Sequence, residues 1–542
     1  MLVNINGAKC VGIDAMHITI EIDVSIGIGF HLVGLGDVAV KESLLRVTTA
    51  MTTLGYKIPG KKIVINLAPA DTHKQGSGFD LPIAAGVLLA TEQLDVSEEE
   101  AKNIASNCLL MGELGLDGSV RQISGALPML SLARSLGLKE FILPRENALE
   151  IQDYAEGLRV YGVESLPDVV EILTKKDGYE KFNIDSFAKE AQKERPDPSL
   201  GFPELTLAGV MDMSEIIGQN QAKRGIEIAA SGGHNIILIG SPGSGKSSLA
   251  KAMCGILPPL SPEENLVTRK IYSVAGIRQP MNSMRPFRSP HYSASLASII
   301  GGGSSSVAPG EISLAHNGIL FIDEFCEASK QVIEALRAPM EDGKVTISRL
   351  KAKIDYPARF TLVAATNPCP CGYYGEGNRC KCTRTRREQY LNRLSGPLLD
   401  RIDLQIWVHP VDPKKLSKKA PGGETSAEIA RRVRKVREIQ RMRFAEEGIN
   451  CNAEMSNSQI GRFCNMTNAA RETLDGIMEK MKLSVRAYYR IQKLSQTIAD
   501  IEAVRRSEAE AVKRGDLNPN EILVEPQHIL EAASYRLIDG QP

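Results

Sequence analysis

The stretch that decides the fold runs from Asn235 to Ala250 and reads NIILIGSPGSGKSSLA. Its apolar start, Ile236 to Ile239, predicts a buried parallel strand, and a helix is expected to begin at the lysine. Between them lies the pattern G-x-x-x-x-G-K-[ST], whose glycines let backbone N–H groups turn toward phosphate oxygens at a helix N-terminus. We therefore predict a phosphate-binding loop, the P-loop, formed by Gly240, Ser241, Pro242, Gly243, Ser244, Gly245, Lys246, Ser247 and Ser248.

Two side chains of the P-loop and two carboxylates further along have predicted chemical roles. Lys246 can reach the β- and γ-phosphates of a nucleotide, and the Ser247 hydroxyl can ligate Mg²⁺. The stretch GILFIDE reads as a buried strand that ends in Asp323 and Glu324. Asp323 is expected to hold Mg²⁺ through water, and Glu324 to polarise the attacking water. The predicted cofactors are ATP and Mg²⁺, and Glu324 predicts hydrolysis as well as binding.

Composition limits the classes of protein that remain. The chain has 542 residues, 43% of them hydrophobic and 24% charged, with a formal net charge of zero. A length of this order predicts three or four domains, and any nucleic-acid surface must be a local patch because the net charge is balanced. We see no apolar run of the roughly 20 residues that span a bilayer and no signal-peptide pattern, so a cytoplasmic protein without a membrane partner is expected.

Patterning along the chain predicts an α/β protein in several parts. The run HITIEIDVSIG alternates in the manner of a strand, and residues 38–54 and 80–94 have helical spacing. The polar and charged stretch after this region ends in prolines and reads as a linker. The predicted parts are an α/β front domain at 1–175, the linker at 176–205, a parallel-sheet nucleotide module at 206–410, and a helical lid region at 411–542.

Four cysteines crowd into the loop at 369–382, in the order C-x-C…C-x-C. Four thiolates can close a tetrahedral site that folds a loop too small to have its own core, which predicts structural Zn²⁺. The spacing is tighter than the usual C-x₂-C, so an iron–sulfur or redox role and free thiols stay as alternatives. Basic and tyrosine residues flank the loop and suit either nucleic acid or a solvated face. The predicted zinc ligands are Cys369, Cys371, Cys380 and Cys382.

Three other features of the sequence are basic, and two of them have two interpretations each. The predicted helix at 425–447 carries seven basic residues between Arg431 and Arg443 against one acid, Glu438, and faces either DNA or solvent. A predicted hairpin within residues 340–360 has basic residues near its turn. The polar insertion at 277–318, with Arg285, Arg288 and His291, reads either as a substrate-touching pore loop or as an exposed loop.

The front domain resembles the proteolytic domain of Lon-type proteases, in ADTHKQGSGFDLPIAAG, MGELGLDGSVRQISGALPMLSLARSLG and FILPRENA. That family uses a Ser–Lys dyad. This chain has Gly78 in place of the nucleophile and Ala126–Pro128 in place of the lysine, while Ser77 and Lys74 are out of register. We therefore expect a scaffold or substrate-docking domain without protease activity.

The nucleotide module resembles the magnesium-chelatase-type AAA+ ring ATPases, and the added Lon-like front domain resembles their ComM (YifB) branch. The resemblance rests on GSPGSGKS, RPFRSPHYSAS, PGEISLAHNGILFIDE, NPCPCG and SGPLLDRID. It implies that Asn367, after the strand FTLVAAT, orients the water, and that Arg401 reaches the γ-phosphate of a neighbouring subunit. A surface salt bridge is the alternative for Arg401. Arg486 is expected over the γ-phosphate as a second sensor, with Arg490 as its competitor.

The same resemblance implies that the turn Ile217–Gly218–Gln219 lies over the adenine, although a bare capping turn has the same sequence. It further implies a homo-oligomer, expected to be a hexamer, that drives branch migration on single-stranded or branched DNA during the integration of transforming DNA. Two other functions stay open: a protein remodeller or unfoldase, which the protease-like domain favours, and a chelatase-type motor subunit. The predicted catalytic residues are Lys246, Glu324, Asn367, Arg401 and Arg486.

Overall fold

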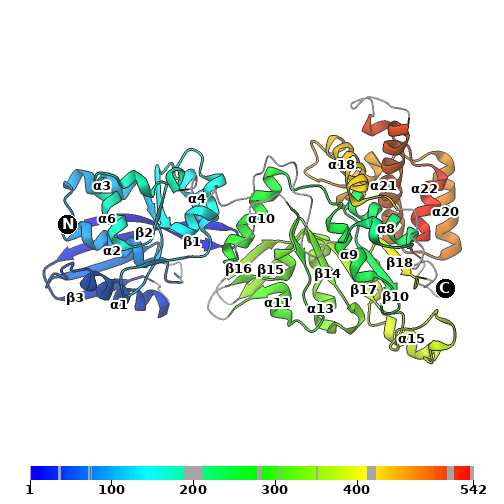
Figure 1. Cartoon of the computed structure of the whole chain (residues 1–542), viewed down its shortest axis with the longest axis horizontal. Helices are drawn as coiled ribbons and strands as arrows, with labels where there is room; N and C mark the ends of the chain where they lie inside the picture. Colours follow the sequence, from blue (N-terminus) through cyan, green and yellow to red (C-terminus); the bar gives the residue numbers. More distant parts are fainter. Residues whose placement is uncertain are drawn as a thin grey trace.

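The computed structural model shows an elongated molecule in which three regions follow one another along the long axis (Figure 1). A sheet domain from the first part of the chain lies at one end, a second sheet with its helices lies in the middle, and a helical region lies at the other end. This architecture confirms the predicted α/β class. The structure describes residues 2–34, 38–70, 74, 76–187, 211–277, 284–303, 307–349, 352–411, 423–509 and 518–536.

The front domain is built on a mixed sheet covered by helices. Its elements are β1 (Leu2–Val11), β2 (Asp14–Ser25), β3 (Gly29–Val33), α1 (Val38–Thr53), β4 (Lys62–Ala68), α2 (Asp80–Ala90), α3 (Glu98–Asn107), β5 (Cys108–Leu110), β6 (Glu113–Leu114), β7 (Val120–Arg121), α4 (Ala126–Ser135), β8 (Glu140–Pro144), α5 (Arg145–Ile151), η1 (Gln152–Tyr154), β9 (Arg159–Val163), α6 (Leu166–Leu173) and η2 (Tyr179–Phe182). Seven strands pair in the order β3-β4-β2-β1-β5-β8-β9. β2 runs antiparallel to β1 and β4, while β5, β8 and β9 are parallel neighbours.

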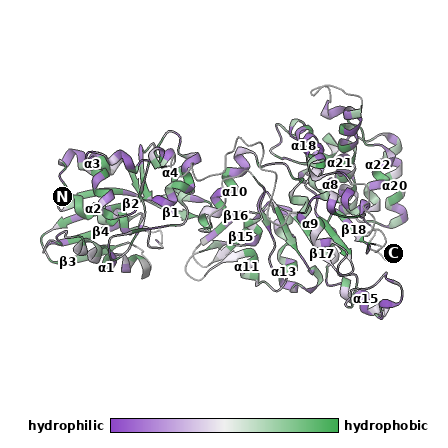
Figure 2. Ribbon diagram, viewed as in Figure 1, coloured by the Kyte–Doolittle hydropathy of each residue, from purple (hydrophilic) through white to green (hydrophobic). Residues whose placement is uncertain are grey.

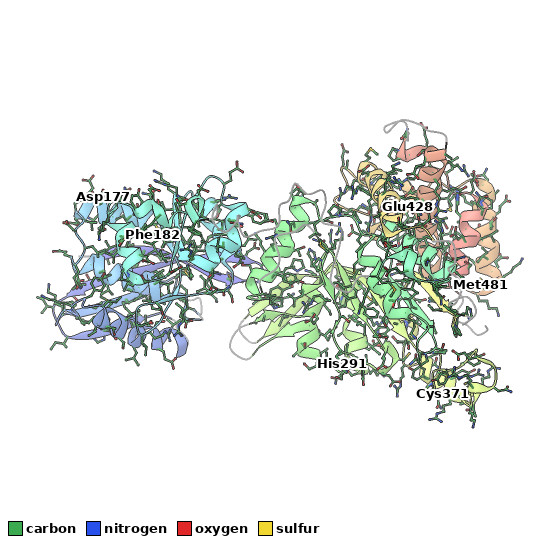
Figure 3. All side chains as sticks on the ribbon, in the orientation of Figure 1. Asp177, Phe182, His291, Cys371, Glu428 and Met481 are labelled. Carbon is green, nitrogen blue, oxygen red and sulfur yellow. The ribbon has the colours of Figure 1, made fainter. Side chains whose placement is uncertain are left out.

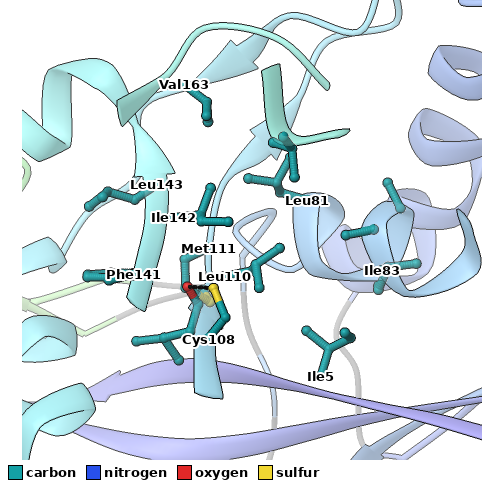
Figure 4. Packing of buried hydrophobic residues seen from close by; sticks show 14 of the residues in the cluster. Ile5, Leu81, Ile83, Cys108, Leu110, Met111, Phe141, Ile142, Leu143 and Val163 are labelled. Atoms are coloured by element: carbon teal, nitrogen blue, oxygen red, sulfur yellow. Dashed lines mark hydrogen bonds between the residues drawn. The ribbon is translucent and has the colours of Figure 1, made fainter. Parts of the chain in front are cut away.

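The core of this domain lies between the sheet and its helices. Figure 4 shows Ile5, Leu81 and Ile142, from β1, α2 and β8, within this space, and all three are fully buried. Burying one such side chain contributes roughly 1.5–3 kcal/mol. Figure 2 shows the same division along the whole molecule, with hydrophobic residues along the strands and hydrophilic ones on outer helices.

The front domain continues further along the chain than the sequence indicated. Tyr179 and Phe182 pack against its core, and Ile184 and Phe187 are buried in it. The predicted linker therefore begins too early, at residue 176, because charged residues surround these spaced apolar positions and hide them in the sequence. The remainder of that predicted linker, residues 188–205, lies outside the described residues.

The middle region is built on a fully parallel sheet. Its elements are η3 (Met213–Glu215), α8 (Asn220–Gly232), β10 (Ile236–Gly240), α9 (Lys246–Cys254), α10 (Pro262–Val274), β11 (Phe287–Arg288), α11 (Leu296–Ile300), β12 (Gly301–Gly302), β13 (Ala308–Pro309), α12 (Glu311–Leu314), β14 (Ile319–Ile322), η4 (Phe325–Glu327), α13 (Lys330–Ala335), α14 (Arg337–Asp342), β15 (Lys344–Arg349), β16 (Ala352–Pro357), β17 (Thr361–Thr366), η5 (Gly377–Arg379), α15 (Arg384–Leu391), α16 (Gly396–Leu399) and β18 (Leu404–Val408). Five strands pair in the order β11-β14-β17-β10-β18, each parallel to its neighbours. All carboxyl ends of these strands therefore meet at one edge of the sheet.

The front domain contacts the middle region through helix α4 and the β1–β2 turn. The backbone N–H of Gly125 donates to the Ser273 carbonyl at 2.8 Å, and the N–H of Leu127 donates to Ser273 Oγ at 3.2 Å. At the β1–β2 turn, Asp14 lies 3.5 Å from the Lys270 ammonium. The predicted hairpin is present as the antiparallel pair β15–β16.

The last region is helical. Its elements are α18 (Ser426–Arg443), η6 (Asn452–Glu454), α19 (Asn457–Phe463), α20 (Asn468–Met481), α21 (Val485–Ala509), η7 (Pro519–Glu521) and α22 (Pro526–Ser534). At its centre, the fully buried Arg443 guanidinium donates to both Asp500 oxygens, at 2.6 and 2.9 Å. Removing one partner of such a pair costs roughly 3–5 kcal/mol, because the other charge stays buried.

The basic helix α18 directs several of its cations inward. Arg432 pairs with Glu227 and with Glu424, and Arg437 donates to the Ala230 carbonyl. Together with Arg443, these side chains hold the helical region to α8 and to α21. The excess of positive charge in the sequence therefore overstated the cationic surface of this helix.

Candidate nucleotide site

The P-loop connects the carboxyl end of β10 to the first turn of α9. Gly243 and Gly245 have positive φ angles of 77° and 93°, which glycine adopts without the steric cost that other residues meet. At Gly240, an added Cβ would lie 2.3 Å from the Val408 carbonyl oxygen, so only glycine fits beside β18. The loop therefore ends with its backbone curled at the positive end of a helix, the arrangement that binds phosphate.

Lys246 is the first residue of α9, and its side chain folds back onto the backbone of the P-loop. Its ammonium donates to the carbonyls of Gly240 and Ser241, at 2.7 and 2.9 Å, and to Asn367 Oδ1 at 3.4 Å. Burial lowers the pKa of Lys246, while the carboxylates of Asp323 and Glu324 act in the opposite direction. The structure thus brings the lysine, the two carboxylates and the asparagine to one edge of the sheet.

The serine and the carboxylates form the part of the site that suits Mg²⁺. Ser247 Oγ donates to Asp323 Oδ2 at 2.8 Å, so the two oxygen ligands already lie side by side. The Glu324 backbone N–H donates to Asp323 Oδ1 at 2.9 Å. Glu324 has a left-handed backbone, with φ of 49°, and its side chain is exposed. Its carboxylate can therefore contact a water molecule at the site.

The turn at Ile217, Gly218 and Gln219 lies against the P-loop. Gly218 and Gln219 have positive φ angles of 69° and 55°. Gln219 Nε2 donates to the carbonyl of His409, at 2.5 Å, and to that of Ser244, at 3.3 Å. The turn therefore joins the P-loop to the end of β18, whichever of its two predicted roles it has.

The opposite edge of the sheet, at the amino ends of the strands, carries an arginine cluster. Arg401 is 5% exposed, pairs with Glu341, and donates to the Pro397 carbonyl at 2.6 Å. A hydrogen bond from Arg401, together with the positive charges of Arg401, Arg486 and Arg490, lowers the pKa of Glu341. A cavity of about 610 Å³ lies at this edge, and its lining includes Glu341, Arg486 and Arg490.

Arg486, the predicted second sensor, lies at this amino edge and not beside the P-loop of its own chain. It shares the cavity lining with Asn235 and Gly318, which precede β10 and β14. The P-loop begins at the other end of β10, about 16 Å away for five extended residues. The reason is the packing of α21 against α8 and α18, which places the start of α21 at the amino edge. Within one chain, Arg486 therefore does not face its own P-loop.

Two residues at this edge were not identified from the sequence. Asp403 is buried and accepts from Arg490 at 2.6 Å, which fixes the competitor of Arg486 in place. Although burial acts to raise it, the positive charge of Arg490 and the nearby His234 ring, 3.6 Å from the carboxylate, hold the pKa of Asp403 far below its usual range. Asp403 follows Arg401 within LLDRID, so the motif offered a signal. Glu341, the partner of Arg401, had no recognisable pattern around it.

The four loop cysteines converge. Their Sγ atoms all lie within 4.8 Å of one another, and Cys369 is 3.3 Å from Cys371 and 3.7 Å from Cys380. Zinc–sulfur bonds of about 2.3 Å in a tetrahedron separate sulfurs by about 3.8 Å, so the cluster fits a four-thiolate metal site. Burial raises the pKa of Cys369 to about 12, while a hydrogen bond from the Tyr373 backbone lowers that of Cys371 to about 6.

The cysteine loop and α15 project from the middle region, and Figure 3 labels Cys371 on this projection. Two tyrosines of the loop are covered by arginines, since Arg379 lies 4.0 Å from the Tyr373 ring centre and Arg387 lies 3.8 Å from that of Tyr374. By contrast, the basic insertion has its arginines in ion pairs. Arg285 pairs with Glu264 at 2.8 Å, and Arg288 with Glu311 at 2.7 Å. These two ion pairs therefore connect parts of the middle region to one another.

Comparison with known proteins identifies the family. The chain is 42% identical to the YifB protein of Salmonella typhimurium over 532 residues, which cover 97% of this chain and 96% of the relative. It is 41% identical to Haemophilus influenzae competence protein ComM over 497 residues, or 91% and 92% of the two chains. This chain belongs to the YifB/ComM family.

Family matches divide the YifB/ComM chain into three segments, each described from the ChlI subunit of magnesium chelatase. The magnesium chelatase family itself matches residues 212–416, the ChlI subunit family matches 20–147, and the ChlI C-terminal family matches 423–515. Lon protease 2 of Bacillus subtilis is 29% identical over 131 residues, 24% of this chain and 22% of the protease. The YifB/ComM chain is thus a magnesium-chelatase-like AAA+ protein, a family that indicates ATP and Mg²⁺ as ligands, with a Lon-like front region.

The Lon-like region of this YifB/ComM chain lacks a nucleophile–base pair at the expected positions. Gly78 has no side chain to react, and Ala126 to Pro128 are buried in the first turn of α4. Ser77 Oγ donates to Glu113, and Lys74 is buried with its ammonium on the Pro69 carbonyl. The dyad positions are therefore occupied by structural residues. Across the described part of the chain, each helix is too short or too polar to pass through a bilayer.

Proposed function

We propose that this chain hydrolyses ATP with Mg²⁺ at the carboxyl edge of its parallel sheet. The observation that carries the proposal is the convergence of Lys246, Ser247, Asp323 and Asn367 through hydrogen bonds. Lys246 and the P-loop backbone hold the phosphates, and Ser247 and Asp323 hold Mg²⁺. Glu324 polarises the attacking water, and Asn367 orients it.

The proposed site is completed by a neighbouring copy of the chain. Arg486 is exposed at the amino edge, away from its own P-loop, and so is available to a phosphate of another subunit. Arg401 lies at the same edge but is buried against Glu341, so it must leave that carboxylate to reach such a phosphate. An arginine at that position stabilises the charge that develops in the transition state. A closed ring, which we propose to be a hexamer, gives every P-loop such a neighbour.

We further propose that the cysteine loop holds a structural Zn²⁺ ion. The support is the separation of its thiol sulfurs, which matches the edges of a zinc tetrahedron. Cys369, Cys371, Cys380 and Cys382 would all be ligands, which leaves no open position for catalysis. Unpaired thiols of this kind suit a reducing compartment, and we place the protein in the cytoplasm.

The proposed substrate of the motor is DNA, single-stranded or branched, in a branch-migration or translocation reaction. The support is the relative named a competence protein and the basic, aromatic character of the projecting cysteine loop. Residues 1–187 would serve as a scaffold, 211–411 as the ATPase core and 423–536 as the lid.

The test is the ATPase rate of the full chain without DNA and with single-stranded, duplex or forked DNA. A DNA motor accelerates with single-stranded or forked DNA. A second candidate, a protein unfoldase, is favoured by the Lon-like front region. An unfoldase would respond to an unfolded protein substrate and not to DNA, which would contradict the DNA proposal while leaving the ATPase site intact.

A further inference from the structure

The cysteine loop touches the nucleotide site at one glycine. Gly372 is buried and has a positive φ of 85°, and an ideal Cβ built on it would lie 2.8 Å from Pro242 Cδ and 2.9 Å from Pro242 Cγ. Pro242 is part of the P-loop, and its ring is rigid. The backbone of the turn at Gly372 therefore lies directly against the P-loop.

The same turn is attached to the metal site and to the predicted water-orienting residue. The Gly372 N–H donates to the Cys369 carbonyl at 2.9 Å and also to the Cys369 sulfur. Cys369 follows Asn367 by two residues, and Asn367 accepts from Lys246 at 3.4 Å. One short segment thus links a thiolate cluster to both the P-loop and the lysine.

Beyond the thiolates, the loop has little that would keep this turn in place. In the segment 370–382 the described side chains are exposed or half-buried, whereas Cys369 is fully buried. Its tyrosines are stacked by arginines of the same projection, not by a hydrophobic core. A loop of this kind depends on its metal for a fixed conformation.

We propose that the metal-bound cysteine loop is a positioning element for the nucleotide site, with Gly372 pressing on Pro242 to hold the P-loop in its phosphate-binding form. This inference rests on the proposed ATP and metal sites and adds a dependence between them. When the metal is lost, the turn at 369–372 is released, and the P-loop and Asn367 lose a fixed neighbour. ATP affinity then falls although no residue that touches ATP has changed.

A steric test uses two glycines of the same loop. Gly372→Ala adds a methyl group against Pro242, whereas Gly375→Ala adds one where no atom lies within 4 Å. Both glycines have positive φ, 85° and 93°, so the backbone strain is matched. We expect Gly372→Ala to bind a fluorescent ATP analogue roughly 10-fold more weakly than Gly375→Ala, as overpacking predicts. Metal content should be equal in the two variants.

A second substitution distinguishes a steric effect at the contact between Gly372 and Pro242 from general damage to the protein. Pro242→Ala removes the Cγ and Cδ atoms that the new methyl group would meet, so Gly372→Ala should weaken ATP-analogue binding less in a Pro242→Ala chain than in the wild-type chain. A second experiment removes the metal through a residue that lies away from the contact between Gly372 and Pro242. Cys382→Ser should lose metal by elemental analysis and weaken ATP-analogue binding, while Lys381→Ser, at the exposed neighbouring position, should keep both.

The outcomes distinguish failure of this inference from failure of the proposed ATP site or of the proposed metal site. Failure of the wild-type chain to bind the analogue would overturn the ATP site itself. Absence of metal from the wild type would overturn the metal site. If the wild type binds both, and Gly372→Ala matches Gly375→Ala or Cys382→Ser loses metal without losing affinity, the coupling between the two sites is wrong.

Discussion

The two edges of the parallel sheet carry different sets of functional side chains. At the carboxyl edge of a single chain, Lys246 donates a hydrogen bond to Asn367, and Ser247 donates one to Asp323. At the amino edge, arginines gather around Glu341 with no phosphate-binding loop beside them. A single chain contains both sets of residues but holds them at opposite edges of the sheet. In the ring that we propose, assembly side by side would bring the two sets together.

ATP turnover at the carboxyl edge should be abolished when the positive charge of Lys246 is removed. Lys246→Ala loses a charged hydrogen-bond donor to the phosphates and the contacts that curl the P-loop, so ATP affinity should fall by roughly 100-fold and turnover should become undetectable. Lys251→Ala, on the exposed side of the same helix, is the matched control and should behave as wild type. Titration with a fluorescent ATP analogue measures both. Normal affinity in Lys246→Ala would remove this lysine from the site.

The base at the same edge should separate binding from hydrolysis. Glu324→Gln keeps the size of the side chain and removes its charge, so ATP should bind normally while kcat falls by roughly 10²–10⁴-fold. Steady-state ATPase kinetics check the rate. Glu327→Gln serves as the control, because Glu327 is an exposed carboxylate three residues further along that pairs with Arg393. Hydrolysis by Glu324→Gln at the wild-type rate would end its assignment as the base.

At the amino edge, replacing Arg486 should impair catalysis, whereas replacing Arg490 should impair stability. Arg486 is exposed, and Arg490 is anchored to buried Asp403. We expect Arg486→Ala to lower kcat by roughly 10²-fold without changing the melting temperature. Arg490→Ala should instead destabilise the fold by about 1–3 kcal/mol, because Asp403 loses a buried partner. Thermal melts and ATPase rates of both variants decide this, and the reverse pattern would exchange their roles.

The smallest effect is expected at the turn that connects the P-loop to β18. Gln219→Asn tolerates the left-handed backbone but shortens the side chain, so its hydrogen bonds to His409 and Ser244 are lost. ATP affinity should fall by roughly 3–10-fold. Asn220→Ala, at the adjacent exposed position, should leave ATP affinity unchanged. A loss larger than that of Lys246→Ala would mean that the turn dominates binding.

The carboxyl edge was largely predictable from sequence, and the amino edge was not. Each strand of a parallel sheet ends at the same edge, so apolar runs that finish at Gly240, Asp323 and Asn367 had to bring those residues together. The position of Arg486 depends on how α21 packs against α8, a contact between residues more than 250 positions apart for which no local pattern exists. Likewise, the charge of α18 was visible, but the acids that pair with Arg432 and Arg443 lie on other elements.

The central claim, that two chains build one site, is tested most directly by mixing two inactive variants. Arg401→Ala keeps an intact P-loop and Glu324, while Glu324→Gln keeps an intact arginine edge. Each should assemble and be nearly inactive alone. Co-assembled in equal amounts, about a quarter of the interfaces would pair two intact halves, so ATPase activity should rise to about that fraction of wild type. A mixture that co-assembles yet stays inactive, or Arg401→Ala that hydrolyses ATP alone at the wild-type rate, would contradict the claim.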